Sequence, residues 1–296
     1  MPQYGLIEGG GTKFMLGIAD ENAVISARLR IATTTPGEVL SAAIAWFREA
    51  GLQPAAIGIA NFGPLDLDRT SPSWGHVTRT AKPHWDGADL AGPFARTFNC
   101  PIGLETDVGG AALAESRWGA GRGHNSLLYL TVGTGVGGGF VHDGRLLAGL
   151  SHPEMGHIRV PRHQDDQGFA GVCPFHGDCL EGLASGPAIM ARWGQPLSQL
   201  AQSQLPPSET DDPRADMIGW YLGQAICDFQ AIMSPARIVL GGGVMDTPGL
   251  LAKVRRHAHQ AGGGYFVGDP EKLVVAPGLA SDSGLLGALA VALATG

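Results

Sequence analysis

The sequence lacks clustered positive charge and long apolar runs. Its 20 lysines and arginines are outnumbered by 27 acidic residues, which gives a formal charge of −7, and the basic residues are scattered. A nucleic-acid surface needs clustered positive charge, so we expect no nucleic-acid partner. The most apolar stretch, residues 285–294, is far shorter than the roughly 20 residues that cross a bilayer. The first ten residues show no basic segment followed by an apolar one, so we expect a cytoplasmic protein without a membrane partner.

Cysteine is also scarce. The four cysteines are too few for a disulfide scaffold in 296 residues, which favours a reducing compartment. A chain of this length is expected to form two lobes or one large α/β unit. Glycine, in contrast, is abundant at 46 residues and has no collagen-like period, so the glycines are expected to serve individual turns and close backbone approaches.

The N-terminal part of the chain reads as a meander of strands followed by alternating helices and strands. Apolar and β-branched residues predict the strands, and apolar residues at helical spacing predict the helices. Turn-forming residues between 61 and 83 predict an excursion over the surface, where specificity often lies. The predicted strands are 5–7, 14–19, 24–31, 55–60 and 102–105, and the predicted helices are 36–50, 88–98 and 109–117.

A second pattern begins at residue 126 and repeats the first. A strand over 127–132, a glycine turn that carries threonine and a returning strand at 140–141 echo residues 6–19, which suggests a duplicated module and two facing lobes. The polar stretch 152–181 has little periodicity. Beyond it we expect a long helix over 212–233, a strand over 238–240 and a final apolar helix over 283–294 capped by Ser283.

Three glycine-rich turns follow predicted strands and are candidates for phosphate binding. Nucleotide phosphates need backbone N–H groups at close range, and glycine permits that approach. Each turn alone could equally be a tight hairpin. None fits the Walker pattern, and the first turn leads into a strand, which argues against a dinucleotide-binding fold. The turns comprise Gly9, Gly10 and Gly11 with Thr12 and Lys13; Gly133 and Gly135 with Thr131 and Thr134; and Gly241, Gly242 and Gly243.

At these residues the sequence resembles the ROK family of sugar kinases and repressors, within the actin-like ATPase superfamily. Residues 8–13 (EGGGTK) resemble the family's first phosphate loop, residues 131–139 its second, and residues 241–245 (GGGVM) its adenosine loop. Residues 135–157, which end in Glu154-Met-Gly-His157, are similar to the family signature. The resemblance covers nearly the whole chain, and within the family residues 7–13, 62–66, 81–85 and 152–157 look most like the bacterial fructokinase branch.

The resemblance implies an α/β fold of two actin-like ATPase (ribonuclease H-like) lobes with an interlobe cleft. The N-terminal lobe would span 1–108, completed by the helix 283–296, and the C-terminal lobe 109–282. It also implies ATP with Mg²⁺, a small hexose and a homodimer. The implied ATP contacts are Gly9, Gly10, Gly11, Thr12, Lys13, Thr131, Gly133, Thr134, Gly135, Pro187, Gly241, Gly242, Gly243, Val244 and Met245.

Asp107 is the candidate general base. Phosphoryl transfer needs a group that takes the proton from the attacking hydroxyl, and Asp107 follows a predicted strand and opens a predicted helix. By itself the residue could be an ordinary helix N-cap. The resemblance instead implies the catalytic base. The family usually has Asn immediately before this Asp and again two places after it, where this chain has Thr106 and Gly109, and Glu8 replaces the usual Asp.

Four polar residues match positions that hold sugar hydroxyls in related kinases: Thr106, Glu154, His157 and Glu181. A carboxylate accepts two hydroxyl bonds and an imidazole can add another, which suits a polyol.

Residues 173–179 (CPFHGDC) predict a zinc site. Cys173, His176 and Cys179 stand three residues apart, and His157 upstream completes a set suited to tetrahedral Zn²⁺. Free thiols beside an unrelated histidine, or a disulfide between the two cysteines, are the alternatives. Histidines 152 and 163 compete for the upstream position. Related kinases usually carry three Cys and one His, so His176 replaces a Cys. Four protein ligands would make the zinc structural.

The sequence therefore predicts an ATP-dependent sugar kinase, with D-fructose phosphorylated at its 6-hydroxyl. Glucose, mannose or an N-acetylhexosamine would use the same machinery. A sugar-responsive repressor, the other activity of the family, would need a DNA-binding helix-turn-helix before the first kinase strand. A catalytically silent sugar-binding or regulatory protein is suggested by Glu8, Thr106 and Gly109, and retention of Asp107 argues against it.

Overall fold

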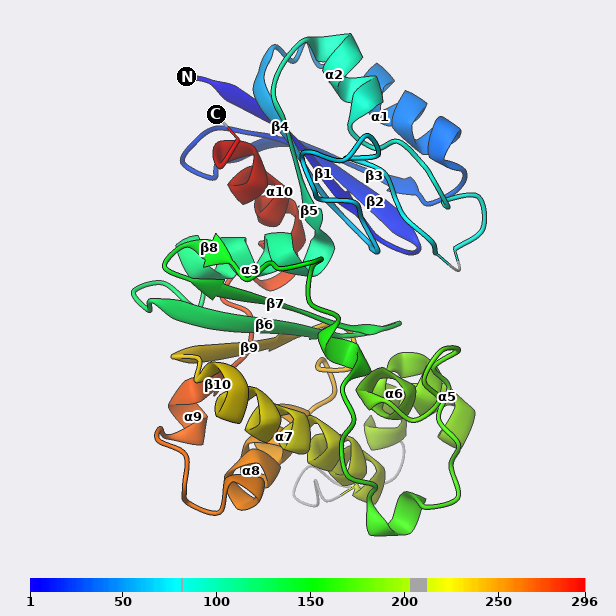
Figure 1. Ribbon diagram of the computed structural model, residues 1–296, viewed down its shortest axis with the longest axis vertical. Coiled ribbons are helices and arrows are strands. Elements are labelled where there is room, and N and C mark those ends of the chain that lie inside the picture. The colour runs from blue at the N-terminus through cyan, green and yellow to red at the C-terminus, as the bar shows by residue number, and fades with distance from the viewer. Residues whose placement is uncertain (81, 203–211, 296) are drawn as a thin grey trace. The chain divides into compact units, whose positions relative to one another are not determined.

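The computed structural model describes residues 1–80, 82–202 and 212–295, so Ala81 of the fructokinase-like segment lies outside the described residues. The chain forms two compact units. The first comprises Met1–Arg122, Gly144–Pro153 and Gly278–Gly296, and the second comprises Gly123–Asp143 and Glu154–Pro277. Both units contain a twisted sheet and helices (Figure 1), which confirms the predicted α/β class. The two lobes inferred from the sequence, 1–108 with 283–296 and 109–282, remain a prediction.

The first unit is built on a mixed sheet whose first three strands form the predicted meander. The order is β3 (Ile25–Ala32), β2 (Lys13–Ala19), β1 (Gln3–Gly9), β4 (Pro54–Asn61) and β5 (Ile102–Thr106). The pairs β1/β2 and β2/β3 are antiparallel, whereas β4 runs parallel to both β1 and β5. All five predicted strands are confirmed. The carboxyl ends of β1, β4 and β5 therefore meet at one edge of this sheet.

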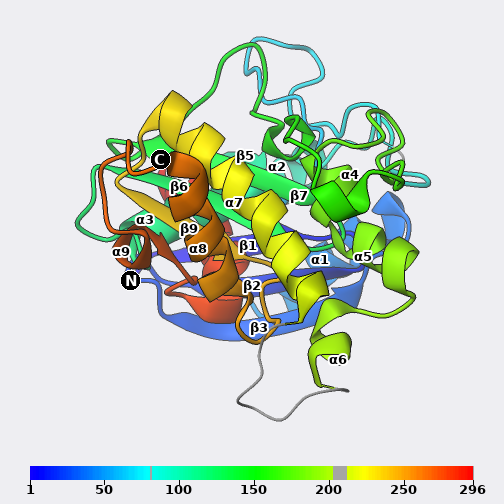
Figure 2. The same cartoon turned by 90° about the horizontal axis from the view of Figure 1, so that it is seen from below.

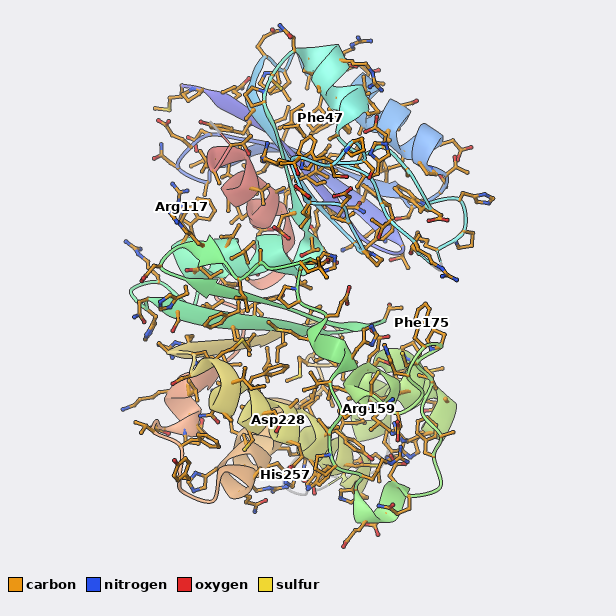
Figure 3. The ribbon with its side chains drawn as sticks, in the orientation of Figure 1. Phe47, Arg117, Arg159, Phe175, Asp228 and His257 are labelled. Carbon is orange, nitrogen blue, oxygen red and sulfur yellow. The ribbon has the colours of Figure 1, made fainter. Side chains whose placement is uncertain are left out.

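Helices cover both faces of the first sheet. Helix α1 (Pro36–Glu49) begins at the N-cap Thr35 with Pro36 and Glu38 in its first turn, a sequence that favours helix initiation. It buries Phe47 against the sheet (Figure 3), in one apolar cluster with the short helix α2 (Gly92–Phe98). Helix α10 (Ser283–Leu293) packs on the opposite face, where the carbonyl of Ala288 lies so near Gly58 that a side chain there would overlap it.

The predicted start of one helix and the predicted cap of another are wrong. The helix expected from residue 88 begins at Gly92, because Ala88 and Leu90 are engaged in backbone hydrogen bonds to Val77 and Gly75. Ser283 does not cap the final helix. Asp282 is its N-cap residue, and the Ser283 hydroxyl donates instead to the buried carboxylate of Glu115 at 2.7 Å. Tertiary hydrogen bonds therefore decide where α2 begins and what the Ser283 hydroxyl bonds to.

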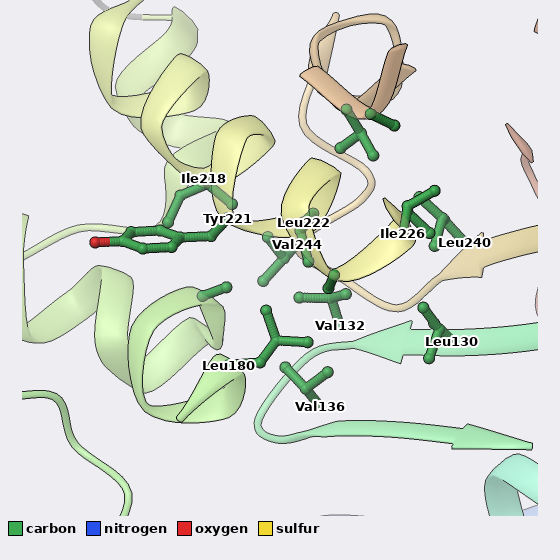
Figure 4. Packing of buried hydrophobic residues seen from close by; sticks show 14 of the residues in the cluster. Leu130, Val132, Val136, Leu180, Ile218, Tyr221, Leu222, Ile226, Leu240 and Val244 are labelled. Atoms are coloured by element: carbon green, nitrogen blue, oxygen red, sulfur yellow. The ribbon is translucent and has the colours of Figure 1, made fainter. Parts of the chain in front are cut away.

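The second unit contains four strands of the other sheet, in the order β10 (Val274–Val275), β9 (Arg237–Gly241), β6 (Ser126–Val132) and β7 (Val136–His142). The short strand β8 (Arg145–Leu146) belongs to the segment 144–153 of the first unit. The predicted strands and the long helix α7 (Pro213–Met233) are confirmed. Helices α7 and α8 (Leu250–Gly262) lie side by side (Figure 2). Figure 4 shows side chains of α7 and the sheet, among them Tyr221 and Leu240, in one apolar core.

The remaining helical elements are short. They are α3 (Asp107–Arg117), η1 (Met155–His157), η2 (Gln164–Asp166), α4 (Leu180–Ala184), α5 (Gly186–Trp193), α6 (Leu197–Gln202), α9 (Pro270–Leu273) and η3 (Ala280–Asp282). None of the helices in the described part of the chain is both long and apolar enough to cross a membrane.

Candidate active site

In the first unit, polar residues gather where β1, β4 and β5 end. Gly9 is the register partner of Asn61, and Asn61 is the partner of Thr106. Asp107 follows directly as the first residue of α3. Ligand sites of α/β proteins lie beyond the carboxyl ends of parallel strands, so this edge is the candidate site of the first unit.

The first glycine turn joins β1 to β2 and is tightly held. Gly10 N–H donates to the carbonyl of Lys13 at 2.9 Å, and the Thr33 hydroxyl donates to the carbonyl of Gly10 at 2.8 Å. The Lys82 ammonium contacts the carbonyl of Gly11. A Cβ at Gly9 would lie 1.8 Å from Oδ1 of Asn61, so only glycine fits there.

Asp107 lies at the N-terminus of α3 but is not its cap. The N-cap is Thr106, whose Oγ1 accepts from the Gly109 N–H at 3.0 Å. Asp107 Oδ1 accepts from the N–H of Val108 at 2.9 Å. The alternative interpretation of Asp107 as an ordinary N-cap is therefore wrong, and the position of its carboxylate at the positive end of a helix favours the ionised form.

The pKa of Glu8, in the first unit, is raised well above its ordinary value. Burial raises its pKa to about 7; the negative charges of Asp107 and Asp282 add to that rise, and Lys13 opposes it. A side chain at Gly284 would overlap the Glu8 carboxylate, with 2.2 Å between Cβ and Oε1. A cation beside Glu8 and Asp107 would lower this pKa, which suits a site for a metal–nucleotide complex.

Asn61 is a site residue that the sequence reasoning missed. Its side chain is fully buried, and Nδ2 donates to the carbonyl of Phe62 at 2.8 Å. Oδ1 has no hydrogen-bond partner among the described residues. The available signal was its position, because a polar residue that ends a buried parallel strand faces the same edge as Asp107.

The second glycine turn, between β6 and β7, is held by several segments of the second unit. Gly133 N–H donates to the carbonyl of Gly135 at 2.8 Å, and the Gly186 N–H donates to the carbonyl of Gly133 at 2.7 Å. Glu181 Oε2 accepts from the N–H of Val136 at 3.0 Å. Pro187 follows Gly186 in the first turn of α5, so this predicted residue lies beside the turn.

The third glycine turn follows β9 and packs on the end of β6. Val244 N–H donates to the carbonyl of Val132 at 3.0 Å. Gly242 has φ of +92°, and a Cβ there would lie 2.4 Å from the same carbonyl, so glycine is required by both backbone and space. The ATP-binding residues predicted in this unit are thus brought together: Thr131, Gly133, Thr134, Gly135, Pro187, Gly241, Gly242, Gly243, Val244 and Met245.

Two cysteines and two histidines of the second unit converge. The ligand atoms of His157, Cys173, His176 and Cys179 all lie within 4.8 Å of one another. His157 Nδ1 is 3.5 Å from Cys179 Sγ and 3.8 Å from Cys173 Sγ, and His176 Nδ1 is 3.6 Å from Cys173 Sγ. The ligand atoms of a tetrahedral zinc ion stand about 3.3–3.8 Å apart, and these three separations agree with that spacing.

The structure argues against the disulfide and against the two competing histidines. Cys173 and Cys179 do not form a disulfide with each other. His163 instead caps η2, where its Nδ1 accepts from the Asp165 N–H at 3.2 Å. His152 belongs to the first unit, where its Nε2 lies 3.4 Å from the N–H of Leu65.

The two ring nitrogens of His157 face different partners. Nδ1 faces the thiols, whereas Nε2 lies 4.0 Å from Oε2 of Glu154. His157 was predicted both as a metal ligand and as a sugar contact. Because the two nitrogens point to different partners, one ring can serve both purposes.

Comparison with known proteins agrees with this arrangement. The ROK family model matches residues 4–295. The fructokinase of Zymomonas mobilis is 49% identical over 98% of this chain and 96% of its own length. A ROK hexokinase structure from Thermus thermophilus has a TM-score of 0.80 and 29% identity, covering 99% of this chain and 98% of that one. A ROK glucokinase from Streptomyces griseus, solved with glucose and AMPPNP, has a TM-score of 0.77 and 25% identity, covering 99% of both chains.

These neighbours have the actin-like ATPase fold, which confirms the predicted fold of the two lobes. The match to the family model spans nearly the whole chain. This protein therefore belongs to the ROK family.

Proposed function

We propose that this chain is an ATP-dependent fructokinase that transfers the γ-phosphoryl group of ATP to the 6-hydroxyl of D-fructose. The observation that carries the proposal is the position of Asp107 at the start of α3, next to the polar strand ends of the first unit. The 49% identity to a fructokinase over nearly the full chain supports fructose as the sugar, since the glucokinase compared above is only 25% identical.

Asp107 would act as general base. Its carboxylate accepts the proton of the sugar hydroxyl as the oxygen attacks the γ-phosphorus, and the bond from phosphorus to the ADP oxygen breaks. Asp107 lies in the first turn of α3, at the end of the helix dipole that favours a negative charge. Mg²⁺ arrives with ATP and neutralises charge on the phosphates.

The glycine turns would hold the nucleotide, and polar side chains would hold the sugar. Backbone N–H groups of residues 9–13 and 131–135 suit the phosphates, and the turn at residues 241–245 suits the nucleoside. Glu154, His157 and Glu181 would bind sugar hydroxyls. The hydroxyl of Thr106, the fourth candidate, is buried and already hydrogen-bonded to Glu105 and Gly109, so we do not assign it a sugar contact. In this arrangement Glu181 has two tasks, since its Oε2 also holds the second glycine turn.

We also propose that His157, Cys173, His176 and Cys179 hold a structural zinc ion. Two buried thiols with two imidazoles are a donor set that zinc prefers. A zinc ion there would link residues 173–179 to His157 at the end of η1. This link would help to position His157 and the neighbouring Glu154 for the sugar. The resemblance to the family is the ground for expecting a homodimer, whereas the sequence patterns are the ground for expecting a cytoplasmic protein.

A coupled ADP-release assay tests the function. The protein with Mg-ATP is measured against fructose, glucose, mannose, N-acetylglucosamine and N-acetylmannosamine at equal concentrations, with Asp107→Ala as control. Turnover that depends on fructose and is lost in the variant supports both the reaction and the base. A preference for another hexose would make that hexose the substrate in place of fructose. Full turnover by Asp107→Ala would show that Asp107 is not the base. No turnover with any of the sugars would favour a sugar-binding protein without catalysis.

A further inference from the structure

The carboxylate of Glu105 is bound to the residue that caps α3. Oε1 of Glu105 accepts from the N–H of Thr106 at 2.8 Å and from its hydroxyl at 3.1 Å. The Thr106 hydroxyl in turn accepts from the Gly109 N–H at 3.0 Å. A hydroxyl has one proton to give, so its bond to Glu105 leaves a lone pair directed at the helix N-terminus. Three consecutive hydrogen bonds therefore fix the first turn of α3.

Gly109 leaves the space that this carboxylate uses. A Cβ at position 109 would lie 2.7 Å from Glu105 Oε1 and 2.8 Å from Thr106 Oγ1, closer than real contacts allow. The backbone of Gly109 is not in the left-handed region, so space and not conformation requires glycine here. Any larger residue would displace either the carboxylate or the capping hydroxyl.

We propose that Glu105, in the space that Gly109 leaves open, is a positioning residue for Asp107. Asp107 stands between Thr106 and Gly109, and its own carboxylate accepts from the adjacent N–H of Val108. Its orientation therefore depends on the cap that Glu105 completes. The inference rests on the proposed role of Asp107 as base. Two departures from the family pattern, Thr106 and Gly109, then belong to one arrangement. The Glu105 carboxylate occupies the space that a side chain at position 109 would fill.

The surroundings of Glu105 fit this role. Burial raises its pKa, while the two hydrogen bonds from Thr106 and the charge of His152 act in the opposite direction. The side chain of Glu105 is partly buried and lies beside the cap residue Thr106. A group placed in this way orients its neighbours and does not itself need to meet the substrate.

A double-mutant cycle between positions 105 and 109 tests the proposal, with kcat and KM for fructose and for ATP as readouts. We expect Glu105→Ala and Gly109→Ala each to lower kcat about tenfold with both KM values changed less than about threefold. The double variant should lose no more than the worse single variant, because both changes remove the same carboxylate from the same place. Glu105→Gln keeps an acceptor oxygen there and should retain kcat within about threefold of the parent.

Glu38→Ala is the matched control, since Glu38 also supports a helix N-terminus of the first unit, that of α1. It should leave kcat unchanged. Wild-type kcat in Glu105→Ala, or multiplicative losses in the double variant, would overturn the proposal. If Glu105→Ala does not fold, the comparison of Gly109→Ala with Glu105→Gln decides it: equal losses would overturn it. Asp107→Ala is measured in parallel to separate two kinds of failure. Full turnover by Asp107→Ala would show that Asp107 is not the base. Normal kcat in Glu105→Ala together with an inactive Asp107→Ala would show that Asp107 is needed and that Glu105 does not position it.

Discussion

The two glycine hairpins share a local design and differ in what surrounds them. Both join antiparallel strands, β1 to β2 and β6 to β7, and both lie beside a parallel strand, β4 or β9. The first hairpin is backed by the buried Asn61 and neighbours two carboxylates, Glu8 and Asp107. The second is held by Glu181, the start of α5 and the turn after β9.

This difference teaches that similar turns can be used for different tasks. In the first unit the turn is packed from behind, and the groups beside it carry charge that a reaction can use. In the second unit the hydrogen-bonding groups around the turn hold it in place, and a loop follows that carries four side chains able to bind a metal ion. The predictions below test whether this contrast holds. Substitutions that change stability come first, beginning with the most costly, and a pH dependence follows.

The largest effect is expected from the metal group. Cys179→Ser should abolish stoichiometric zinc and destabilise the protein by more than about 4 kcal/mol, as the loss of a structural metal can. Elemental analysis and urea unfolding measure both. Cys100→Ser, outside the group of four ligands, is the control and should keep its zinc. Zinc absent from freshly purified parent protein would contradict the site and remove this part of the contrast.

The metal is expected not to be the only anchor of its loop. Asp166 on η2 pairs with Arg192 of α5 at 2.7 Å, with both side chains about 5% exposed, and accepts from the Tyr221 hydroxyl at 2.7 Å. Figure 3 marks Arg159 and Phe175 on the same loop. Asp166→Ala leaves a buried charge without its partner and should cost about 3–5 kcal/mol of unfolding free energy.

Asp216→Ala is the matched control for that change. Asp216 also pairs with basic residues, His257 and Arg256, but is 32% exposed, so its loss should cost less than about 1 kcal/mol. Equal losses at the two positions would show that burial is not what makes the Asp166 pair matter.

The glycines of the two hairpins should differ in tolerance. Gly9→Ala meets Asn61 Oδ1 at 1.8 Å and should cost about 1–3 kcal/mol, measured by urea unfolding. Gly135→Ala meets Glu181 Oε2 at 2.7 Å, the end of a longer side chain that can move, and should cost less. Gly11→Ala and Gly133→Ala, which have open space, should change stability by about 0.5 kcal/mol or less. A costly Gly11 change would contradict this account.

The last expected effect is a pH dependence at Glu8. Its folded pKa of about 7 lies above the ordinary value of 4.5, so the folded state keeps a proton that the unfolded state loses in this range. Stability should therefore fall between pH 4.5 and 7 and level off above it. Glu8→Gln should remove this component, so that its stability relative to the parent rises through the same window. Parallel curves for parent and variant would mean that Glu8 titrates as it does in the unfolded chain.

Local patterns in the sequence were enough for the strands, the long helix α7 and the three glycine turns. Alternating or β-branched runs end at residues that only a turn accommodates, and these signals act within a few residues. The start of α2 and the cap of α10 were not predictable in this way, because Ala88 and Leu90 bond to Val77 and Gly75 and Ser283 bonds to Glu115 across long stretches of chain.

The sequence by itself determined the family, the candidate base and the four candidate metal ligands, because each depends on residue type at a fixed spacing. Tertiary structure alone decided which partner each group meets. It placed the two nitrogens of His157 toward different neighbours, put Asn61 behind Gly9, and brought Glu105 into the space beside Gly109. Spacing along the chain specifies what a side chain can do, whereas burial and contact between distant strands determine what it is next to.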